Sequence, residues 1–180
     1  MTGQLIAVVG PSGVGKDSVM AGLVAADPAI QLVKRTITRP ADLGGEDYTP
    51  ITPADFAALA KEGRFCLHWQ AHGLSYGLPA QVLDDVQAGQ TRLANLSRSA
   101  LTEADQIFPN LKVLNITASV ETLAKRLAGR GRESAPEIAK RLAQATKPLP
   151  TGLDIVSVSN DGPLEQTVEA ALSALQPVKA

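Results

Sequence analysis

A glycine-rich stretch near the N-terminus contains the residues whose types and spacing best suit chemistry. It reads Gly10-Pro-Ser-Gly-Val-Gly15-Lys16. Glycines let successive backbone N–H groups turn toward one point without a side-chain clash, which makes a nest for an anion. A helix that starts directly afterwards aims its N-terminal partial positive charge at the same point, and Lys16 adds a mobile full charge. The stretch therefore predicts a cradle for the phosphates of a nucleotide, and the alternative is a glycine-rich turn that binds nothing.

One position in this cradle departs from the usual pattern. We expect the cradle to comprise Gly10, Pro11, Ser12, Gly13, Val14, Gly15, Lys16, Asp17 and Ser18. The hydroxyl residue that normally follows the lysine and binds Mg²⁺ is replaced by Asp17, with Ser18 one place later. A carboxylate beside polyphosphate is repelled unless a cation lies between them, so we expect Asp17 to act on Mg²⁺ directly or through a bound water. Its alternative role is to favour the helix N-terminus electrostatically.

The segments around the cradle predict the elements that must position it. The apolar run Gln4–Val9 indicates a buried strand, and Asp17–Ala26 a helix that ends before Asp27-Pro28. Further along, we expect strands at Gln31–Thr36, Phe65–His72, Arg92–Leu96, Lys112–Ile116 and Asp154–Val158. Helices are expected to begin near Pro79, Ser99 and Pro163, and a helix capped by Ser119 is expected to run to Ala128 and to be broken by Gly129 and Gly131. Thr52 is predicted to be a helix N-cap, and Ser134 and Glu137 have the spacing of a capping box for a helix that runs to about Thr146. An irregular segment is expected at Arg39–Pro50 and a turn at Gly73–Gly77. This alternation predicts a three-layer α/β fold with a central parallel sheet.

Composition limits the classes of protein and partner. The chain has 180 residues, enough for one domain, with 44% hydrophobic and 19% charged residues, as in soluble globular proteins. A net charge of −1 provides no global basic field for nucleic acid or an anionic membrane. A single cysteine, Cys66, allows no intramolecular disulfide, and no apolar stretch approaches membrane-spanning length. We therefore expect a cytoplasmic protein with a small-molecule substrate.

A local cationic segment stands out in this neutral chain. Between Val120 and Lys147 lie seven basic residues, Lys125, Arg126, Arg130, Arg132, Lys140, Arg141 and Lys147, against Glu121, Glu133 and Glu137. This imbalance suggests a small anionic ligand, although basic residues four apart on a helix are often only a solvated face.

Further motifs follow in a fixed order along the chain. They are Thr38-Arg39-Pro40 with Gly45-Glu-Asp-Tyr48, Trp69 with Gly73-Leu-Ser-Tyr76-Gly77, Lys125-Arg-Leu-Ala-Gly-Arg130-Gly, Ile138-Ala-Lys-Arg141-Leu, and Asn160-Asp161. In these motifs and the glycine-rich loop the chain resembles the guanylate kinase superfamily over nearly its whole length. The resemblance implies a P-loop kinase fold that uses ATP and Mg²⁺. It also implies catalytic roles for Lys16, Arg126, Arg130 and Arg141, and a place near adenine for Asn160, whose alternative role is capping.

The same resemblance implies a division of the single domain into three regions. The core would comprise residues of about 1–34, 90–128 and 148–180. An acceptor-binding region would cover about 35–89, and a lid about 129–147. We expect lid closure to exclude water and so limit ATP hydrolysis.

The residues that recognise the guanine base in that superfamily are replaced here by other residue types. The glutamate expected before Trp69 is His68, and the acidic residues at the end of the third core strand are Asn95-Leu-Ser97. Without carboxylate acceptors the guanine N–H groups would stay unpaired, at a cost of several kcal/mol. Gly15-Lys-Asp-Ser18 with Arg35-Thr-Ile-Thr-Arg39-Pro instead resembles the ribose 1,5-bisphosphate phosphokinases of bacterial phosphonate catabolism.

That subfamily resemblance implies a base-free acceptor. ATP would donate its γ-phosphoryl to the 1-phosphate of ribose 1,5-bisphosphate and give 5-phosphoribosyl 1-diphosphate. An acceptor with two phosphates suits basic side chains in place of acidic ones. The expected acceptor-binding residues are Arg35, Arg39, Tyr48, His68 and Tyr76, although both tyrosines could simply pack.

Other functions remain open from the sequence. Within the kinases, the alternatives are a guanylate kinase or another small phosphotransferase, such as a gluconate or shikimate kinase. From a different class, guanylate kinase-like domains also serve as non-catalytic binding modules, but these tend to lose the phosphate loop. A metal site at Cys66, His68 and His72 would have three ligands without a fourth, so we favour Cys66 in the core and His68 beside a pocket.

Overall fold

The computed structural model describes residues 3–11, 13–40, 47–131, 133–145 and 148–175. Its larger sheet has five parallel strands. Their order across the sheet is β2 (Ile30–Leu32), β7 (Thr91–Asn95), β1 (Gln4–Val9), β8 (Leu111–Thr117) and β9 (Ile155–Ser159). The central strand β1 is buried from Leu5 to Val9, as expected for a strand covered on both faces.

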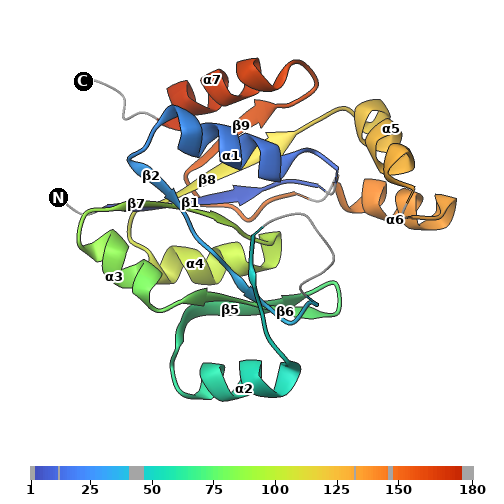
Figure 1. Cartoon of the computed structure of the whole chain (residues 1–180). Coiled ribbons are helices and arrows are strands. Elements are labelled where there is room, and N and C mark those ends of the chain that lie inside the picture. Colours follow the sequence, from blue (N-terminus) through green and yellow to red (C-terminus); the bar gives the residue numbers. More distant parts are fainter. Residues whose placement is uncertain (1–2, 12, 41–46, 132, 146–147, 176–180) are drawn as a thin grey trace.

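Helices cover both faces of this sheet (Figure 1). One face carries α1 (Lys16–Ala26) and α7 (Leu164–Leu175), which pack on Ile6 and Val8. The opposite face carries α3 (Gln81–Gln87), the short 3₁₀ helix η1 (Arg98–Ala100) and α4 (Leu101–Ile107), which pack on Leu5 and Ala7. The predicted three-layer α/β fold with a central parallel sheet is confirmed.

A second, smaller sheet lies beside the α4 face of the core (Figure 1). Its strands are ordered β4 (Thr49–Pro50), β3 (Thr36–Ile37), β6 (Leu74–Pro79) and β5 (Phe65–Ala71). Helix α2 (Pro53–Lys61) packs on its outer face, where the rings of Phe56 and Phe65 stack 4.7 Å apart. The hydroxyl of Thr52 accepts the backbone N–H of Asp55, so the predicted N-cap of this helix is confirmed.

Strand β6 was not expected from the sequence, which predicts a turn at residues 73–77. The reversal needs only His72 and Gly73, whose φ angles are 52° and 74°. Two consecutive positive φ angles are typical of the tight turns that join antiparallel strands. Gly77 argued against a strand in the sequence, because glycine weakens a strand interior. A glycine is required at this position, since a Cβ there would lie 2.7 Å from the ring of Phe65.

Two further boundaries differ from expectation. The strand predicted at 31–36 is two strands, because the chain leaves the large sheet after Leu32 and enters the small sheet at Thr36. The helix expected to stop at Ala128 is α5 (Val120–Arg130), which passes through Gly129 and ends at Gly131, where φ is 64°. An isolated glycine is tolerated within a helix, whereas positive φ ends one.

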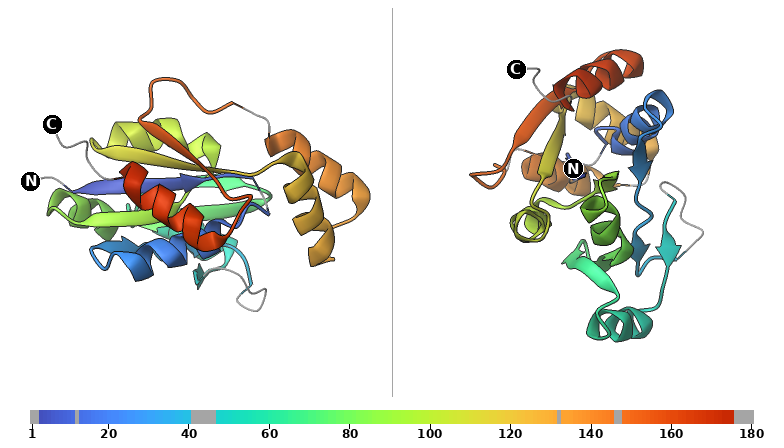
Figure 2. Two further views of the ribbon diagram at one scale, coloured as in Figure 1. Left: turned by 90° about the horizontal axis from the view of Figure 1, so that it is seen from above. Right: turned by 90° about the vertical axis from the view of Figure 1, so that its left-hand side faces the viewer.

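Helix α5 and the helix that follows it extend from the C-terminal edge of the large sheet (Figure 2). Helix α6 (Ala135–Ala145) begins after Ser134, whose backbone N–H donates to Glu137 Oε2 at 2.7 Å while the Glu137 N–H donates to Ser134 Oγ at 3.4 Å. The predicted capping box is therefore confirmed. Residue 146, where this helix was expected to end, lies outside the described residues. None of the described helices is both long and apolar enough to cross a membrane.

Candidate active site

The glycine-rich loop joins β1 to α1 at the C-terminal edge of the large sheet. Gly13 and Gly15 adopt φ angles of 84° and 94°, a backbone conformation that L side chains rarely reach. The Val14 N–H donates to the Pro11 carbonyl at 3.2 Å and closes the turn. Gly15 stands at the N-cap of α1, where it has no side chain to satisfy the first N–H groups of that helix. The strand–loop–helix context predicted for an anion cradle is confirmed.

Two of the glycines also allow close packing behind the loop. A Cβ on Gly10 would lie 2.6 Å from the Ile116 carbonyl oxygen of β8. A Cβ on Gly15 would lie 2.7 Å from Asn160 Nδ2, in the segment after β9. Strand β8 and the segment after β9 therefore support the loop from behind, which leaves its other side for a ligand.

Lys16 and Asp17 begin the helix that follows. The ammonium group of Lys16 donates to the Gly10 carbonyl at 2.7 Å, so its side chain folds back across the loop. Asp17 and Ser18 are exposed on the first turn of α1. Ser12, also expected in the cradle, lies outside the described residues.

Arg126 braces the loop from helix α5. Its guanidinium donates to the carbonyl oxygens of Val14 at 3.1 Å, Gly13 at 3.5 Å and Asn160 at 2.7 Å. The sequence suggested a direct catalytic role for Arg126. Its three bonds join the loop to the segment after β9, so we propose a positioning role for Arg126.

Asn160 braces the same loop from the other direction. It is buried, its amide donates to the Val14 carbonyl at 2.7 Å, and its side-chain oxygen accepts from Thr167 Oγ1 at 2.7 Å. Those partners are loop backbone and helix α7, so Asn160 ties the loop to that helix, and its place near adenine stays a prediction. Thr167 was not singled out at all, since a threonine in a helix carries no local signal of such a role.

We predict that Arg126→Ala loosens the loop and weakens both ATP binding and turnover. Hydrogen bonds from charged groups are worth about 1.5–3 kcal/mol, so kcat/KM for ATP should fall by about tenfold to a hundredfold. Arg126→Lys keeps the charge but not the fork geometry, so its kcat/KM for ATP should lie between those of the wild type and Arg126→Ala. The matched control is Lys125→Ala, an exposed neighbour on the same helix. Equal kinetics of Arg126→Ala and Lys125→Ala would contradict the proposed role of Arg126 in holding the loop.

Arg141 on helix α6 forms an ion pair, and Arg130 on the last turn of α5 lies in solvent. Arg141 Nε lies 3.4 Å from Glu133 Oε1, and the Glu133 side chain is only 9% exposed. Arg130 is exposed at the last turn of α5, and Arg132 is outside the described residues. Both arginines thus come from a pair of packed helices, of which α5 contacts the glycine-rich loop.

His72 joins this cationic region from the small sheet. Burial lowers the pKa of its imidazole, and the positive charges of Arg141, Lys16 and Lys140 lower that pKa further. The tip of the β5–β6 turn therefore lies near both the loop lysine and helix α6. The sequence considered His72 only as a metal ligand, because nothing local indicates that this turn approaches α6.

The small sheet holds two arginines against aromatic rings. Arg35 is 5% exposed and its Cζ lies 4.8 Å from the centre of the Tyr76 ring. Arg39 Cζ lies 4.4 Å from the centre of the Tyr48 ring, and the Tyr48 hydroxyl donates to the Pro40 carbonyl. Arg39 Nε is buried without a hydrogen-bond partner among the described residues. Four of the five expected acceptor-binding residues, Arg35, Arg39, Tyr48 and Tyr76, thus form two neighbouring cation–ring pairs.

His68 does not join them. Register pairs Trp69 with Tyr76, and side chains alternate along a strand, so His68 points to the opposite face of the sheet. Its ring lies 6.1 Å from that of Phe56 and 6.2 Å from that of Phe65, beside helix α2. The residues of β5 that share the Trp69 face include Leu67, which is buried. The sequence predicts that this segment is a strand, but it does not indicate which face of the strand turns toward the core.

The alternative metal site finds no support in the geometry. The Cys66 thiol contacts the carbonyl oxygen of Pro79 at 3.4 Å, and burial raises its pKa to about 11. Within the described ranges, no group of three or more His, Cys, Asp or Glu side chains is arranged to hold a metal ion.

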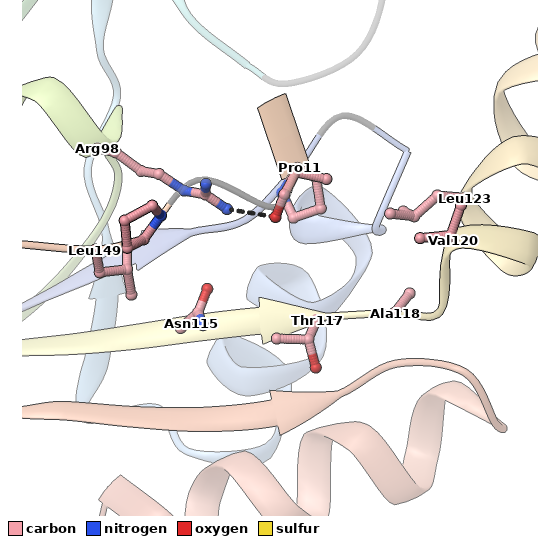
Figure 3. A pocket seen from close by; sticks show the side chains of 10 residues that line it. Pro11, Arg98, Asn115, Thr117, Ala118, Val120, Leu123 and Leu149 are labelled. Carbon is pink, nitrogen blue, oxygen red and sulfur yellow. Dashed lines mark hydrogen bonds between the residues drawn. The ribbon is translucent and has the colours of Figure 1, made fainter. Parts of the chain in front are cut away.

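A cavity of about 300 Å³ lies beside Pro11 of the loop and is lined by residues of β8, α5 and the segment after α6 (Figure 3). Arg98 points toward Pro11 across it, and its guanidinium also donates to the Ala145 carbonyl at 3.5 Å. Asn115 and Leu149 contribute to the walls. Burial lowers the pKa of Arg98. The cavity thus lies between Ala145, the last residue of α6, and strand β8.

Comparisons with known proteins identify relatives of this chain in sequence and in fold. The chain is 48% identical to the ribose 1,5-bisphosphate phosphokinase PhnN of Ruegeria sp. (strain TM1040), over 99% of this chain and 94% of that protein. It is 44% identical to the protein of the same name from Brucella melitensis biotype 2, over 98% of this chain and 93% of that protein. A guanylate kinase structure from Anaplasma phagocytophilum has the same fold, with a TM-score of 0.70 at 22% identity, over 97% of this chain and 85% of that one. The family described as "Guanylate kinase" matches residues 2–177, and this chain belongs to that family.

Proposed function

We propose that this chain is an ATP-dependent kinase that phosphorylates the 1-phosphate of ribose 1,5-bisphosphate, giving 5-phosphoribosyl 1-diphosphate and ADP. Support comes from full-length relatives of 48% and 44% identity that bear the name of this activity. The observation that carries the proposal is the pair of guanidinium groups on tyrosine rings, Arg35 on Tyr76 and Arg39 on Tyr48. Two fixed cations suit an acceptor with two phosphates and no base.

The reaction requires positioning rather than a general base. The second pKa of a phosphate monoester is about 6, so the attacking oxygen is already deprotonated near neutral pH. That oxygen forms a bond to the γ-phosphorus of ATP while the bond from the γ-phosphorus to the bridging oxygen breaks, and ADP leaves. The protein must hold the two oxygens in line and stabilise charge on the transferred group.

The residues of this chain divide that work between donor and acceptor. The backbone N–H groups of the loop and the N-terminus of α1 would hold the donor phosphates, with Lys16 moving from the Gly10 carbonyl onto them. Arg35 and Arg39 would hold the acceptor phosphates. Arg130 and Arg141 would approach the transferred group from the lid, Arg141 by exchanging its Glu133 partner for phosphate oxygens.

We propose the same three-part division of the chain as before. The large sheet with its helices forms a core of about 1–34, 90–128 and 148–180. The acceptor region of about 35–89 contains the small sheet, and the lid of about 129–147 contains α6. Lid closure over the loop would exclude water and so protect ATP from hydrolysis.

The donor set around the loop fits Mg²⁺ carried by the nucleotide. Mg²⁺ binds through one or two carboxylates together with phosphates and waters, and the exposed Asp17 beside Lys16 is such a carboxylate. When bound, the ion would neutralise charge on the phosphates. Asp17 would hold it directly or through water, while the loop amides and Lys16 bind the remaining oxygens.

Asp17→Ser tests this role. We expect the Mg²⁺ concentration for half-maximal rate to change by at least about threefold, because a full negative charge near the ion is lost. ATP-dependent thermal stabilisation, measured with and without Mg²⁺, gives a second readout that does not require turnover. Identical Mg²⁺ dependence in both assays would leave Asp17 only its role at the helix N-terminus.

The proposed function is tested by acceptor preference. Purified protein with Mg–ATP is offered ribose 1,5-bisphosphate, ribose 5-phosphate, GMP and gluconate, and ADP formation is measured. We expect kcat/KM for ribose 1,5-bisphosphate to exceed that for GMP by about a hundredfold or more, since guanine would leave polar groups unpaired. Faster turnover of GMP would overturn the proposal. Absence of turnover and of stabilisation by millimolar Mg–ATP would instead indicate a non-catalytic binding module.

A further inference from the structure

The cavity beside Pro11 has a cation in its wall. Of the residues that the structure describes around it, only Arg98 carries a charge, and none is acidic. Figure 3 shows the Arg98 side chain extending into this space, toward Pro11 of the glycine-rich loop. The volume of about 300 Å³ lies at the lower end of the range for small-molecule sites. A guanidinium group in a wall without carboxylates suits a small anion.

One hydrogen bond of Arg98 runs to the end of helix α6. Its Nη2 donates to the Ala145 carbonyl oxygen at 3.5 Å, which is longer than an ordinary N–H···O bond. A bond from a guanidinium group to a phosphate oxygen is shorter, and it is roughly twice as strong as a bond between neutral groups. A phosphate in the cavity would therefore compete well with this carbonyl for Nη2.

Asn115 adds a hydrogen-bond acceptor to the same wall. It lies on β8, and its amide donates to Ser157 Oγ at 3.2 Å. Its buried Oδ1 has no hydrogen-bond partner among the described residues. A buried acceptor without a partner is costly unless a water or a ligand donates to it. Sugar hydroxyl groups are such donors, so the wall offers groups for both parts of a sugar phosphate.

A series of contacts joins Arg98 to the acceptor region. Arg35 lies over the Tyr76 ring, which stacks on Trp69 with the ring centroids 5.5 Å apart. Trp69 Nε1 donates to Ser97 Oγ at 2.9 Å, and Ser97 directly precedes Arg98. The arginines of the small sheet and the wall of the cavity are thus parts of one connected structure.

The small sheet has less positive charge than a sugar bisphosphate requires. A phosphate monoester carries about −1.5 to −2 near neutral pH, so two of them exceed the single charges of Arg35 and Arg39. We infer that Arg98 is a specificity-determining residue that binds the 5-phosphate of the acceptor in the cavity beside Pro11, while Arg35 and Arg39 bind the 1-phosphate. The inference rests on the proposed function and deepens it, because it names the side chain that distinguishes a sugar bisphosphate from a sugar with one phosphate.

The test combines a change of residue with a change of acceptor. Arg98→Gln is assayed with ribose 1,5-bisphosphate and with ribose 1-phosphate, which lacks the 5-phosphate. We expect kcat/KM to fall by about tenfold to a hundredfold for the bisphosphate and by less than about threefold for ribose 1-phosphate, because only the first loses a bond to a charged group. The Kd for Mg–ATP should stay unchanged. Arg98→Lys keeps the charge and should recover part of the preference for the bisphosphate.

Arg92→Gln is the matched control. Arg92 also belongs to this part of the chain, on β7, but its Nε lies 3.6 Å from Asp85 Oδ2 and it does not line the cavity. Its loss should lower stability without changing the preference between the two acceptors. A folded Arg98→Gln that loses activity equally toward both acceptors, or that keeps the wild-type preference, would overturn the inference.

Calorimetric binding of the two ribose phosphates gives the same comparison without turnover. We expect Arg98→Gln to raise the Kd for ribose 1,5-bisphosphate by about tenfold or more and to leave that for ribose 1-phosphate nearly unchanged. A wild-type protein that binds the bisphosphate through Arg98 but does not phosphorylate it would overturn the proposed function alone. Equal Kd values for the bisphosphate in wild type and Arg98→Gln would overturn the inference alone.

Discussion

Lys16→Ala is expected to lower the rate of phosphoryl transfer by about a hundredfold to a thousandfold, the size of effect seen when one charge-stabilising group is removed from an active site. The ammonium group of Lys16 lies on the Gly10 carbonyl, at the edge of the loop nest. We expect this full positive charge to move from there onto the donor phosphates. The measurement is single-turnover transfer from ATP to ribose 1,5-bisphosphate, which isolates the chemical step from product release.

The fold should survive this substitution. The hydrogen bond from Lys16 to the Gly10 carbonyl is worth about 1 kcal/mol, and the Lys16 side chain is not part of either core cluster. Lys61→Ala, an exposed lysine on α2, is the matched control and should retain wild-type rates. If Lys16→Ala remained folded and transferred phosphate at the wild-type rate, the loop would not be the donor site.

Arg39→Gln is expected to lower kcat/KM for the acceptor by about a hundredfold, because bonds to a charged group are worth about 1.5–3 kcal/mol. Its guanidinium is held 4.4 Å from the Tyr48 ring, and its buried Nε lacks a partner among the described residues. A buried donor without a partner is costly unless a ligand satisfies it. The Kd for ATP should stay unchanged, which separates an acceptor role from a donor role.

Two variants sharpen the interpretation of Arg39. Arg39→Lys keeps the charge but cannot bind a phosphate with a planar fork, so it should recover only part of the lost activity. Arg64→Gln removes an exposed arginine from the start of the same sheet and should have wild-type kinetics. A rise in the Kd for ATP with an unchanged acceptor KM would place Arg39 at the donor site and contradict the proposal.

The glycine-rich loop could be predicted from the sequence because its determinants are local. Gly13 and Gly15 provide positive φ angles, and the strand and helix beside them have strong patterns of their own. The capping box at Ser134 and Glu137 was predictable for the same reason. Strand β6 was not, since Gly77 and Pro79 disfavour a strand in isolation and only packing against Phe65 explains Gly77.

The braces behind the loop depend on contacts between distant segments. Arg126 and Asn160 both bond to Val14 from parts of the chain far along the sequence, so no local pattern indicates those partners. The face of β5 on which His68 lies was likewise decided by which side of the small sheet packs on the core. The sequence thus identified the residue types needed for a base-free anionic acceptor, and tertiary packing decided which of them lie together.

The most direct test of the central claim is the identity of the product. Phosphorus NMR of the reaction of wild-type protein with Mg–ATP and ribose 1,5-bisphosphate would follow the two acceptor phosphates separately. The account predicts that the 1-phosphate signal is replaced by the pair of coupled signals of a diphosphate, while the 5-phosphate signal stays a monoester. A diphosphate formed at the 5-position, or ADP and free phosphate alone, would contradict it.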